Sequence, residues 1–509
     1  MRTLRHQAGQ IFFIVAFSIV TLMGFAALAL DLGFLYATKR QMQTAADAAA
    51  IAAANALQTS NSADYVQAAK DVASLDGFTD GTNGVTVTVP ASSGCPNAAN
   101  QQCVAVTIAQ AVPTFFLGAI GYSTVNVSVQ ASGGTVNGPA CIYALDPSAA
   151  DAISLTGNVN INVSCGIIDD STSASALYAN GIVNVTTTST GVAGNYSSTG
   201  IVTFTPKPIT QIAPAVDPLG SLQPPSVGTC TQAAVTNAGT NTTYSGGIWG
   251  TVNLAPAVYS GGWNISNPII SRLNFAAGTY GNGINIGGDI SSLNFSAGQY
   301  QNGGGSGNSI TIGGNISIAV FAAPGAGQSY TFCGPLSISG NFAITLQPGL
   351  YYGGITVPAA NASITFSPGT YILAGGGLSV TGNSTLTGTG VTFYNTTGLG
   401  GYGPINLTGN ETANLSAPTS GSMEGILFFQ DRTIAKGSSG STILGNSNST
   451  FNGALYFPTT SLNYIGNSSA SGYTLLIADT LSITGNSSLG DNYSSLSNGS
   501  PIRSSALYE

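Results

Sequence analysis

A six-residue pattern that recurs at nearly constant spacing constrains the fold of this chain more than any other feature. The pattern reads apolar-x-[Pro/Ala]-[Gly/Ala]-x-Tyr, and its copies lie at residues 254–259, 275–280, 295–300, 346–351 and 366–371. Successive tyrosines are 21, 20, 51 and 20 residues apart. A repeat of about 20 residues is typical of a parallel β-solenoid, in which each repeat forms one coil. We therefore expect an all-β, right-handed parallel β-helix over residues 141–493.

In such a stack, like residues of successive coils lie over one another. Phe275 is then expected over Phe295, and Tyr280 over Tyr300. An antiparallel sandwich is the alternative fold, but it does not explain repetition at this period. Recurrent Gly-Asn pairs predict corners at which glycine adopts a positive φ. The expected ladder residues are Tyr259, Phe275, Tyr280, Phe295, Tyr300, Tyr351, Phe366 and Tyr371.

The composition agrees with folded, turn-rich β-structure. Only 6% of residues are charged and 68 are glycine, yet 43% are hydrophobic, which is enough to form a core. The net charge is −8. Nucleic-acid binding requires clusters of Lys and Arg. Beyond residue 80 the basic residues are few and scattered, so nucleic acid is excluded as a partner; these residues are Lys207, Arg272, Arg432, Lys436 and Arg503.

A second constraint is an uncharged apolar run over residues 11–30. Twenty helical residues span about 30 Å, the thickness of a bilayer's hydrocarbon core. We expect a retained transmembrane helix that carries the rest of the chain out of the cytoplasm. Two alternatives involve cleavage, either by signal peptidase to leave Leu30 first, or after Gly9 as in pilins, although Ile14 stands where pilins have Glu. The expected anchor residues are Ile11, Phe12, Phe13, Val15, Phe17, Val20, Leu22, Phe25, Leu28 and Leu30.

Strong helix formers without proline follow the apolar run, so we expect one helix to about Leu57, with residues 1–60 as the anchoring segment. The Ala-rich stretch 45–56 reflects either helix propensity or close approach of another membrane helix.

The sequence from residue 31 onward resembles the N-terminus of TadE/TadG-like Flp pilus-assembly proteins. The residues that carry this resemblance include Asp31, Gly33, Tyr36, Lys39, Arg40, Gln43 and Asp47.

The resemblance implies a single-pass protein of the bacterial inner membrane, with its C-terminal region periplasmic or extracellular. It also implies that other pilus-assembly membrane proteins are partners. It supplies no catalytic residues.

Residues 61–134 predict a small membrane-proximal α+β unit. A helix is expected over 62–75 with Ser62 as its N-cap, followed by strands at 85–89, 104–108 and 125–129. At the other end of the chain, the apolar segments 425–432, 453–458 and 473–480 resemble the closing coils of longer TadG-like proteins, and this resemblance implies that they close the stack. The polar residues 494–509 are expected to form a loose tail.

Six cysteines in an exported chain favour disulfides, although six buried thiols are the alternative. Pairing of neighbours along the sequence predicts Cys95–Cys103, Cys141–Cys165 and Cys230–Cys333. Their spacing does not fit a metal site. The single histidine, His6, lies in the N-terminal stub, far from these cysteines.

The sequence contains few residues in arrangements suited to catalysis. Some β-helix proteins cleave polysaccharides with converging carboxylates, and the adjacent acids here are Asp169 and Asp170, which we expect to be solvated loop residues. Aromatic columns can bind sugars, but a core role is preferred; Trp249 and Trp263 are the first candidates for a glycan site. We expect no enzyme activity, cofactor or metal. A glycan-binding adhesin unconnected to pili, or a polysaccharide-active enzyme, remains as an alternative.

Overall fold

The computed structural model describes residues 7–58, 64–90, 93–95, 98–230, 242–302, 307–445, 449–466, 472–485 and 489–508. The chain divides into two compact units. The α+β unit comprises residues 1–137 together with 503–509, and the solenoid unit comprises residues 138–502. The segments predicted as 1–60 and 61–134 therefore share one unit.

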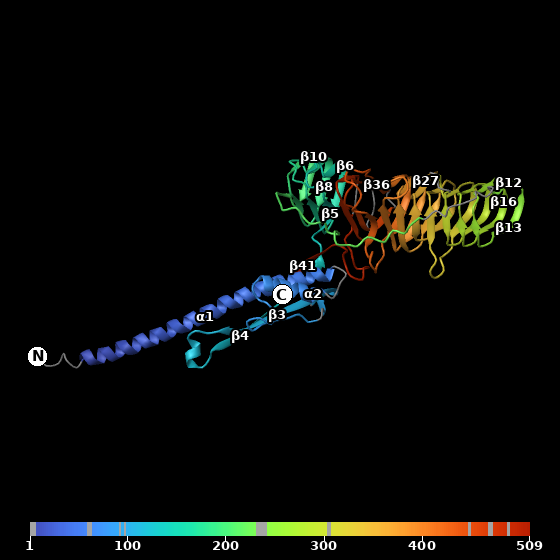
Figure 1. Cartoon of the computed structure of the whole chain (residues 1–509). Helices are drawn as coiled ribbons and strands as arrows, with labels where there is room; N and C mark the ends of the chain where they lie inside the picture. The colour runs from blue at the N-terminus through green and yellow to red at the C-terminus, as the bar shows by residue number, and fades with distance from the viewer. Residues whose placement is uncertain are drawn as a thin grey trace. The chain divides into compact units, whose positions relative to one another are not determined.

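The α+β unit begins with one long helix, α1 (Gln7–Gln58), which has 52 residues (Figure 1). At 1.5 Å per residue it is about 78 Å long. The sequence prediction of a continuous helix through the apolar run is confirmed. A second helix, α2 (Tyr65–Leu75), starts after Asp64 rather than at the predicted Ser62, which lies outside the described residues.

A small antiparallel sheet packs on the second half of α1. Its strand order is β1-β3-β4-β41, and β2 pairs with β3. The predicted strands 104–108 and 125–129 lie within β3 and β4, and the predicted strand 85–89 corresponds to β1, which ends one residue earlier. The alternating valines of these strands and the Ala face of α1 form one core, which includes Ala46, Ala50, Val87 and Val106. The strands are β1 (Val85–Thr88), β2 (Ser93–Cys95), β3 (Ala98–Pro113), β4 (Thr124–Asn137) and β41 (Arg503–Tyr508).

The prediction of a loose C-terminal tail is wrong for its last residues. Strand β41 pairs antiparallel with β4, from Asn137↔Arg503 to Ser132↔Tyr508. The tail looks loose in the sequence because it is short and polar, whereas its partner strand lies more than 360 residues earlier in the chain. The solenoid unit is thus inserted between two neighbouring strands of the α+β sheet.

The solenoid unit is a parallel β-solenoid, as the repeat predicts. One sheet contains 14 strands, and neighbouring strands come from successive coils. In order these are β10 (Tyr196–Thr205), β8 (Leu177–Thr186), β6 (Ile153–Asn162), β40 (Leu481–Thr484), β38 (Leu462–Gly466), β36 (Ser441–Gly445), β33 (Ile405–Gly409), β30 (Leu378–Gly382), β27 (Ile355–Ala360), β24 (Leu336–Ile338), β21 (Ile310–Ile312), β18 (Ile284–Ile286), β15 (Trp263–Ser266) and β12 (Thr242–Ser245).

A second parallel sheet runs along another side of the stack. Its strands are β11 (Ile209–Thr210), β9 (Thr190–Val192), β7 (Gly166–Asp169), β5 (Ala140–Ala144), β39 (Thr474–Ala478), β37 (Thr450–Phe457), β35 (Ile426–Gln430), β32 (Val391–Thr396), β29 (Gly369–Ala374), β26 (Gly349–Tyr352), β23 (Tyr330–Cys333), β20 (Gln299–Gln301), β17 (Thr279–Tyr280) and β14 (Val258–Tyr259).

A third side is formed by β13 (Ile248–Leu254), β16 (Ile269–Phe275), β19 (Asp289–Phe295), β22 (Asn315–Phe321), β25 (Ala343–Leu346), β28 (Ser363–Phe366), β31 (Thr385–Thr389) and β34 (Thr412–Ser416), and it continues into β37.

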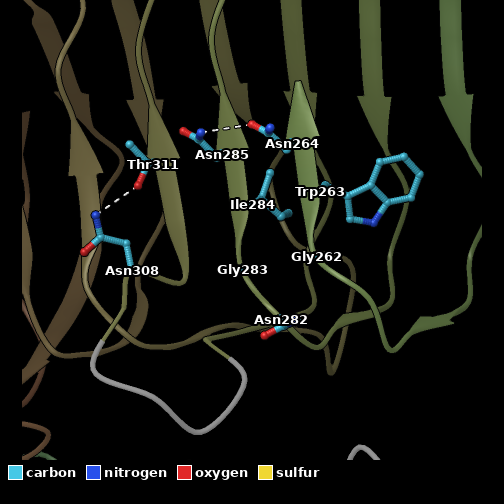
Figure 2. A pocket seen from close by; sticks show the side chains of 9 residues that line it. All are labelled: Gly262, Trp263, Asn264, Asn282, Gly283, Ile284, Asn285, Asn308 and Thr311. Carbon is cyan, nitrogen blue, oxygen red and sulfur yellow. Dashed lines mark hydrogen bonds between the residues drawn. The ribbon is translucent and has the colours of Figure 1, made fainter. Parts of the chain in front are cut away.

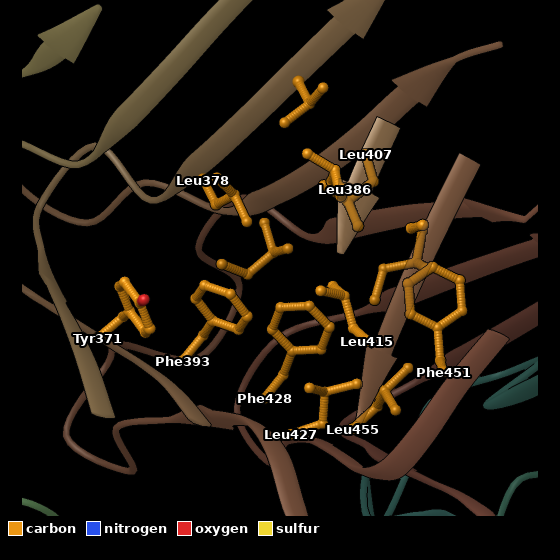
Figure 3. Close-up of a cluster of buried hydrophobic side chains, with 14 of the residues drawn as sticks. Tyr371, Leu378, Leu386, Phe393, Leu407, Leu415, Leu427, Phe428, Phe451 and Leu455 are labelled. Carbon is orange, nitrogen blue, oxygen red and sulfur yellow. The ribbon is translucent and has the colours of Figure 1, made fainter. Parts of the chain in front are cut away.

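The predicted register is confirmed, since Phe275 pairs with Phe295 and Tyr280 with Tyr300. Apolar side chains point inward at alternate positions and form a continuous core (Figure 3). Positive φ occurs at Gly157, Gly314, Gly382, Gly409 and Gly485 of the Gly-Asn pairs, but Gly340 is not among these corners.

The coils do not follow the chain from one end to the other. The first three coils, which contain β6, β8 and β10, form one end of the stack, and β12 lies at the opposite end (Figure 1). From β12 the chain winds back until β39 and β40 pair with β5 and β6 of the first coil. The prediction that residues 425–432, 453–458 and 473–480 close the stack is therefore wrong, because the first coil covers them.

Two disulfides lie in the solenoid unit, Cys141–Cys165 and Cys230–Cys333. Both join pairs that neighbour pairing predicts. The third predicted pair, Cys95–Cys103, involves Cys95, whose side chain lies outside the described ones.

Candidate functional site

The N-terminal half of α1 presents an apolar surface that nothing in its own unit covers. Phe12, Phe13 and Phe17 are 72–77% exposed. The other described anchor residues are 40–69% exposed, namely Val15, Val20, Leu22, Phe25, Leu28 and Leu30. The side chain of Ile11 lies outside the described ones. Within the described chain, one helix is long and apolar enough to span a membrane.

Asp31, the first charged residue after the apolar run, is 1% exposed. Its carboxylate accepts backbone N–H groups of Phe115 and Phe116 at 2.9 Å and of Leu117 at 2.6 Å. These donors lie in the turn between β3 and β4, where a 3₁₀-helix (Leu117–Ile120) begins. Unpaired N–H groups at a helix N-terminus favour a negative charge. Asp31 therefore fixes the β3–β4 turn against α1, a role that its position in the sequence motif did not reveal.

The other motif residues differ in their surroundings. The Gln43 side chain donates to Asp47 at 2.8 Å and to the carbonyl of Gln130 on β4 at 3.2 Å. Tyr36, Lys39 and Arg40 are exposed. A Cβ on Gly33 would have no heavy atom within 4 Å, so this glycine leaves the helix surface open. The motif thus divides into residues that hold the sheet and residues left on the surface.

The Ala-rich stretch of α1 is covered within its own unit. Ala45, Ala46, Ala49, Ala50 and Ala53 have no exposed surface. Strand β4 approaches so closely that a Cβ on Gly133 would lie 2.2 Å from the carbonyl oxygen of Ala50. These small residues therefore admit the chain's own sheet, and not the second membrane helix that their pattern suggested.

The solenoid ladder residues form buried columns. Phe275 stacks on Phe295 with centroids 4.8 Å apart, and Tyr280 on Tyr300 at 5.2 Å. Tyr351, Phe366 and Tyr371 are also buried, whereas Tyr259 near the stack's end is half-buried. The column continues from Tyr371 through Phe393 to Phe428 (Figure 3). Buried rings offer no face to a sugar, so this ladder belongs to the core.

Asp169 and Asp170 are buried, contrary to the expectation of solvated loop acids. Their carboxylates bind different partners and do not act together. Asp169 accepts the N–H of Ser171 at 3.0 Å, while Asp170 accepts the N–H of Ala215 at 2.6 Å. Burial raises the pKa of Asp169 from 3.8 to about 6, and burial also raises the pKa of Asp170. Among the residues that the structure describes, no group of three or more His, Cys, Asp or Glu residues could hold a metal ion.

Asp170 and Arg432 instead hold the connector, by which we mean residues 211–230 between β11 and the far end of the stack. The Arg432 guanidinium donates to the carbonyls of Leu219 and Leu222 and to the Tyr456 hydroxyl. Tyr456 donates in turn to Asp217 at 2.5 Å. These contacts give Arg432 a structural role.

A shallow, neutral hollow of about 360 Å³ lies beside β15, β18 and β21 (Figure 2). Its polar lining includes Asn264, Asn285, Asn308 and Thr311, and Asn285 donates to Asn264 at 3.1 Å. Trp263 borders the hollow but is 9% exposed, whereas Trp249 is 45% exposed and lies outside it. The hollow is suited to neutral, hydroxyl-bearing groups rather than to charged ones.

The hollow is part of a longer polar row on the 14-stranded sheet. The outward residues that pair from coil to coil are uncharged and can form hydrogen bonds. Asn285 is exposed and the others are partly exposed; the row consists of Asn264, Asn285, Thr311, Ser337, Thr356 and Ser379. Asn406 continues the row beyond Ser379. Adjacent strands lie about 4.8 Å apart, so the row repeats at this distance.

Residues 9–56 match a family model described as "Putative Flp pilus-assembly TadE/G-like". The matched segment coincides with almost the whole of α1 and covers about a tenth of the chain. No curated protein and no solved structure matches the chain significantly. The Tad-type similarity therefore concerns the anchoring helix, and the solenoid unit has to be interpreted from its own residues.

Proposed function

We propose, with the Tad-type segment at residues 9–56 as premise, that this chain is a membrane-anchored, non-enzymatic component of a Tad/Flp-type pilus-assembly or secretion system. Its place is the bacterial inner membrane, with both units after the apolar run on the non-cytoplasmic side. Its partners are other membrane proteins of that system, and the solenoid is the part that contacts partners or surfaces outside the cytoplasm.

The observation that carries the proposal is the division of α1 into two halves. The half up to Leu30 is apolar and exposed, as a lipid-facing helix requires, whereas the half from Met42 onward is buried against α2 and the sheet. The match to the Tad-type model spans both halves. A non-enzymatic role is supported because Asp170, one of the two adjacent acids considered for chemistry, binds the connector instead, as does Arg432.

Fractionation of native cells tests this role. A tag on the C-terminus is followed in washed membranes and in filaments sheared from the cell surface. We expect the full-length chain in membranes. Its recovery mainly in the filament fraction would contradict an assembly role and would make the chain a tip or surface adhesin.

The contribution of the solenoid is tested by an internal deletion. Because β41 completes the α+β sheet, residues 138–502 should be removed and Asn137 joined to Arg503 through a short Gly/Ser linker. We expect this variant to reach the membrane but to lose pilus assembly or surface adherence. Normal assembly and adherence at wild-type levels of the variant would show that the solenoid is dispensable and would refute its proposed role.

The neutral polar row favours a second candidate, binding of an uncharged glycan by the 14-stranded sheet. Thr356→Arg with Ser379→Arg places two cations in the middle of the row. Thr365→Arg with Thr387→Arg is the matched control, because both residues lie in the same coils on strands β28 and β31. If the sheet binds glycan, retention on a neutral polysaccharide resin is lost only in the first variant. Equal retention of both variants excludes this surface.

A further inference from the structure

The turn between β3 and β4 carries a cluster of aromatic side chains that its own unit leaves exposed. Phe115 is 68% exposed, Phe116 48% and Tyr122 64%. Residues 113–123 contain no charged side chain. Three large aromatic residues exposed on one short turn form the kind of apolar patch that marks an interaction surface.

The position of this turn along α1 is fixed. All three N–H groups bound by Asp31 come from it, and Phe115 packs edge-on against Phe34 of α1 with centroids 5.4 Å apart. In Figure 1 the β3–β4 hairpin extends back along α1 toward its apolar half. The turn therefore meets the helix where the uncharged run ends at Leu30.

Given the proposed membrane span of α1, on which this inference rests, that point is the membrane boundary. Twenty helical residues before Asp31 cover about 30 Å, which is the full hydrocarbon thickness. The turn then lies at the depth of the lipid headgroups, where aromatic residues are enriched. Tyr36, 67% exposed on the next turn of α1, lies at a similar depth.

We propose that the β3–β4 turn is a second membrane contact, in which Phe115, Phe116 and Tyr122 insert into the interfacial layer of the bilayer that α1 spans. A lipid surface fits better than a protein partner, because the cluster continues the exposed apolar surface of α1 at Leu30 and Phe34.

Contact of both α1 and the β3–β4 turn with the same membrane restricts the orientation of the α+β unit more than α1 alone does. A single helix rotates about its axis and tilts in the bilayer. The turn is held against α1 through the buried Asp31 carboxylate. Its insertion into the interfacial layer therefore fixes the rotation of α1 about its own axis. The α+β unit is thereby held in one orientation at the membrane.

Depth-dependent fluorescence quenching tests the proposal on the full-length protein, reconstituted one copy per nanodisc with phosphatidylcholine and phosphatidylglycerol. Phe116→Trp reports the turn and Phe17→Trp reports the anchor. The unsubstituted protein supplies the background of Trp249 and Trp263. Lipids carry a nitroxide quencher either near the headgroup or deep in the acyl chain. We expect the shallow quencher to remove the fluorescence added at position 116, and the deep quencher to remove that added at position 17.

Each other outcome has a distinct meaning. Quenching at position 17 without quenching at position 116 overturns the second contact but leaves the anchor intact. No quenching at either position refutes the membrane span and the proposed function with it. Quenching at position 116 that needs several copies per disc assigns the aromatic cluster to contacts between copies and overturns the lipid contact.

Asp31→Ala in the Phe116→Trp protein tests the role of the carboxylate. Without its three hydrogen bonds the turn is released from α1, so the shallow quenching should fall. Ser18→Ala is the matched control, since it removes only a hydroxyl that bonds to the carbonyl of Ile14 within α1. The same two substitutions made in the Phe17→Trp protein verify, by deep quenching at position 17, that both variants still insert. Undiminished shallow quenching in Asp31→Ala would show that Asp31 does not position the turn.

Discussion

The tyrosine of the solenoid repeat has a hydrogen-bonding role that explains its place in the pattern. In each of the five copies, its hydroxyl donates to the backbone carbonyl four residues earlier, as Tyr280 does to Ala276 and Tyr351 to Gln347. A buried polar group requires a partner, and this bond satisfies both the hydroxyl and a carbonyl at the coil's corner. The ring meanwhile stacks on the ring of the next coil.

Removal of one such hydroxyl tests this explanation. Tyr351→Phe leaves the Gln347 carbonyl without this donor at a fully buried site, and we expect a loss of about 1–3 kcal/mol in stability. Tyr259→Phe is the control, because its bond to Ala255 lies at the exposed end of the stack and its loss should cost less than about 1 kcal/mol. Denaturant midpoints in detergent measure both changes. Equal midpoints for the two variants would contradict the role of the buried bond.

A second prediction at this scale concerns pH. Burial raises the pKa of Asp169 from 3.8 to about 6, so the folded state binds its proton more tightly than the unfolded state. This contribution to stability is complete below pH 4 and is lost as pH rises through about 6, by at most about 3 kcal/mol.

Asp169→Asn removes that titration. Unfolding midpoints of this variant and the parent, compared at pH 4.5 and pH 7.5, should differ in their pH dependence, with the variant gaining relative stability at the higher pH. Asp146, Asp170 and Asp479 are present in both proteins, so the difference in pH dependence reports Asp169 together with its interaction with Asp170 and Asp146. An identical pH dependence would mean that Asp169 does not titrate in this range.

At the scale of elements, the sequence predicts strand pairing correctly where a repeat places the same residue type at equivalent positions of successive coils. The repeat fixes the register of β16 on β19, since Asn274 and Phe275 recur as Asn294 and Phe295. The length and apolarity of α1 likewise predict one helix. By contrast, the contact of Asp31 with Phe115 joins residues 84 apart and has no periodic signal. The Ala-rich face of α1 left two interpretations open, helix propensity or the approach of another membrane helix, and its partner is the chain's own sheet. Small residues allow a close approach but do not identify the approaching element.

The approach of β4 to α1 gives a prediction for that element pair. Gly133→Ala places a Cβ 2.2 Å from the Ala50 carbonyl oxygen, so helix and strand have to separate. We expect a loss of about 1–3 kcal/mol and faster amide exchange in β4. Gly33→Ala, where a Cβ meets nothing within 4 Å, should exchange as the parent does. Unchanged exchange of β4 in Gly133→Ala would contradict the close packing.

At the scale of the whole molecule, the solenoid depends on the connector. Because the first three coils lie at one end and β12 at the other, the chain has to run the length of the stack between them. Along its length the connector is held first by Asp170, then by Arg432 together with Tyr456, and finally by the Cys230–Cys333 disulfide. The stacking of β39 on β5 could not be predicted, since it joins residues more than 330 apart that share only apolar character. Lys436 bridges Asp146 and Asp479 at 2.8 and 3.0 Å, beside that junction.

The two described disulfides should differ in their effect on stability. Cys230–Cys333 spans 103 residues and Cys141–Cys165 spans 24. Loop entropy predicts losses of about 4.7 and about 3.5 kcal/mol for the respective double Ser variants. Limited proteolysis should also cut the connector only in the first variant. Cleavage of the connector in neither variant would show that its other contacts suffice to hold it.

The insertion of the solenoid between β4 and β41 determines how the protein bears mechanical load. The chain leaves the α+β sheet at Asn137 and returns at Arg503, and these two residues are paired. A force transmitted from the solenoid along β4 and β41 therefore acts on both strands at the end where Asn137 and Arg503 are paired. Strand β4 then has to slide along β3, with which it pairs from Pro113↔Thr124 to Cys103↔Gly134. Since ladder hydrogen bonds lie perpendicular to the strands, sliding strains many of them at once, whereas peeling breaks them one after another. Tension on the solenoid would thus meet the resistance of a sheared sheet.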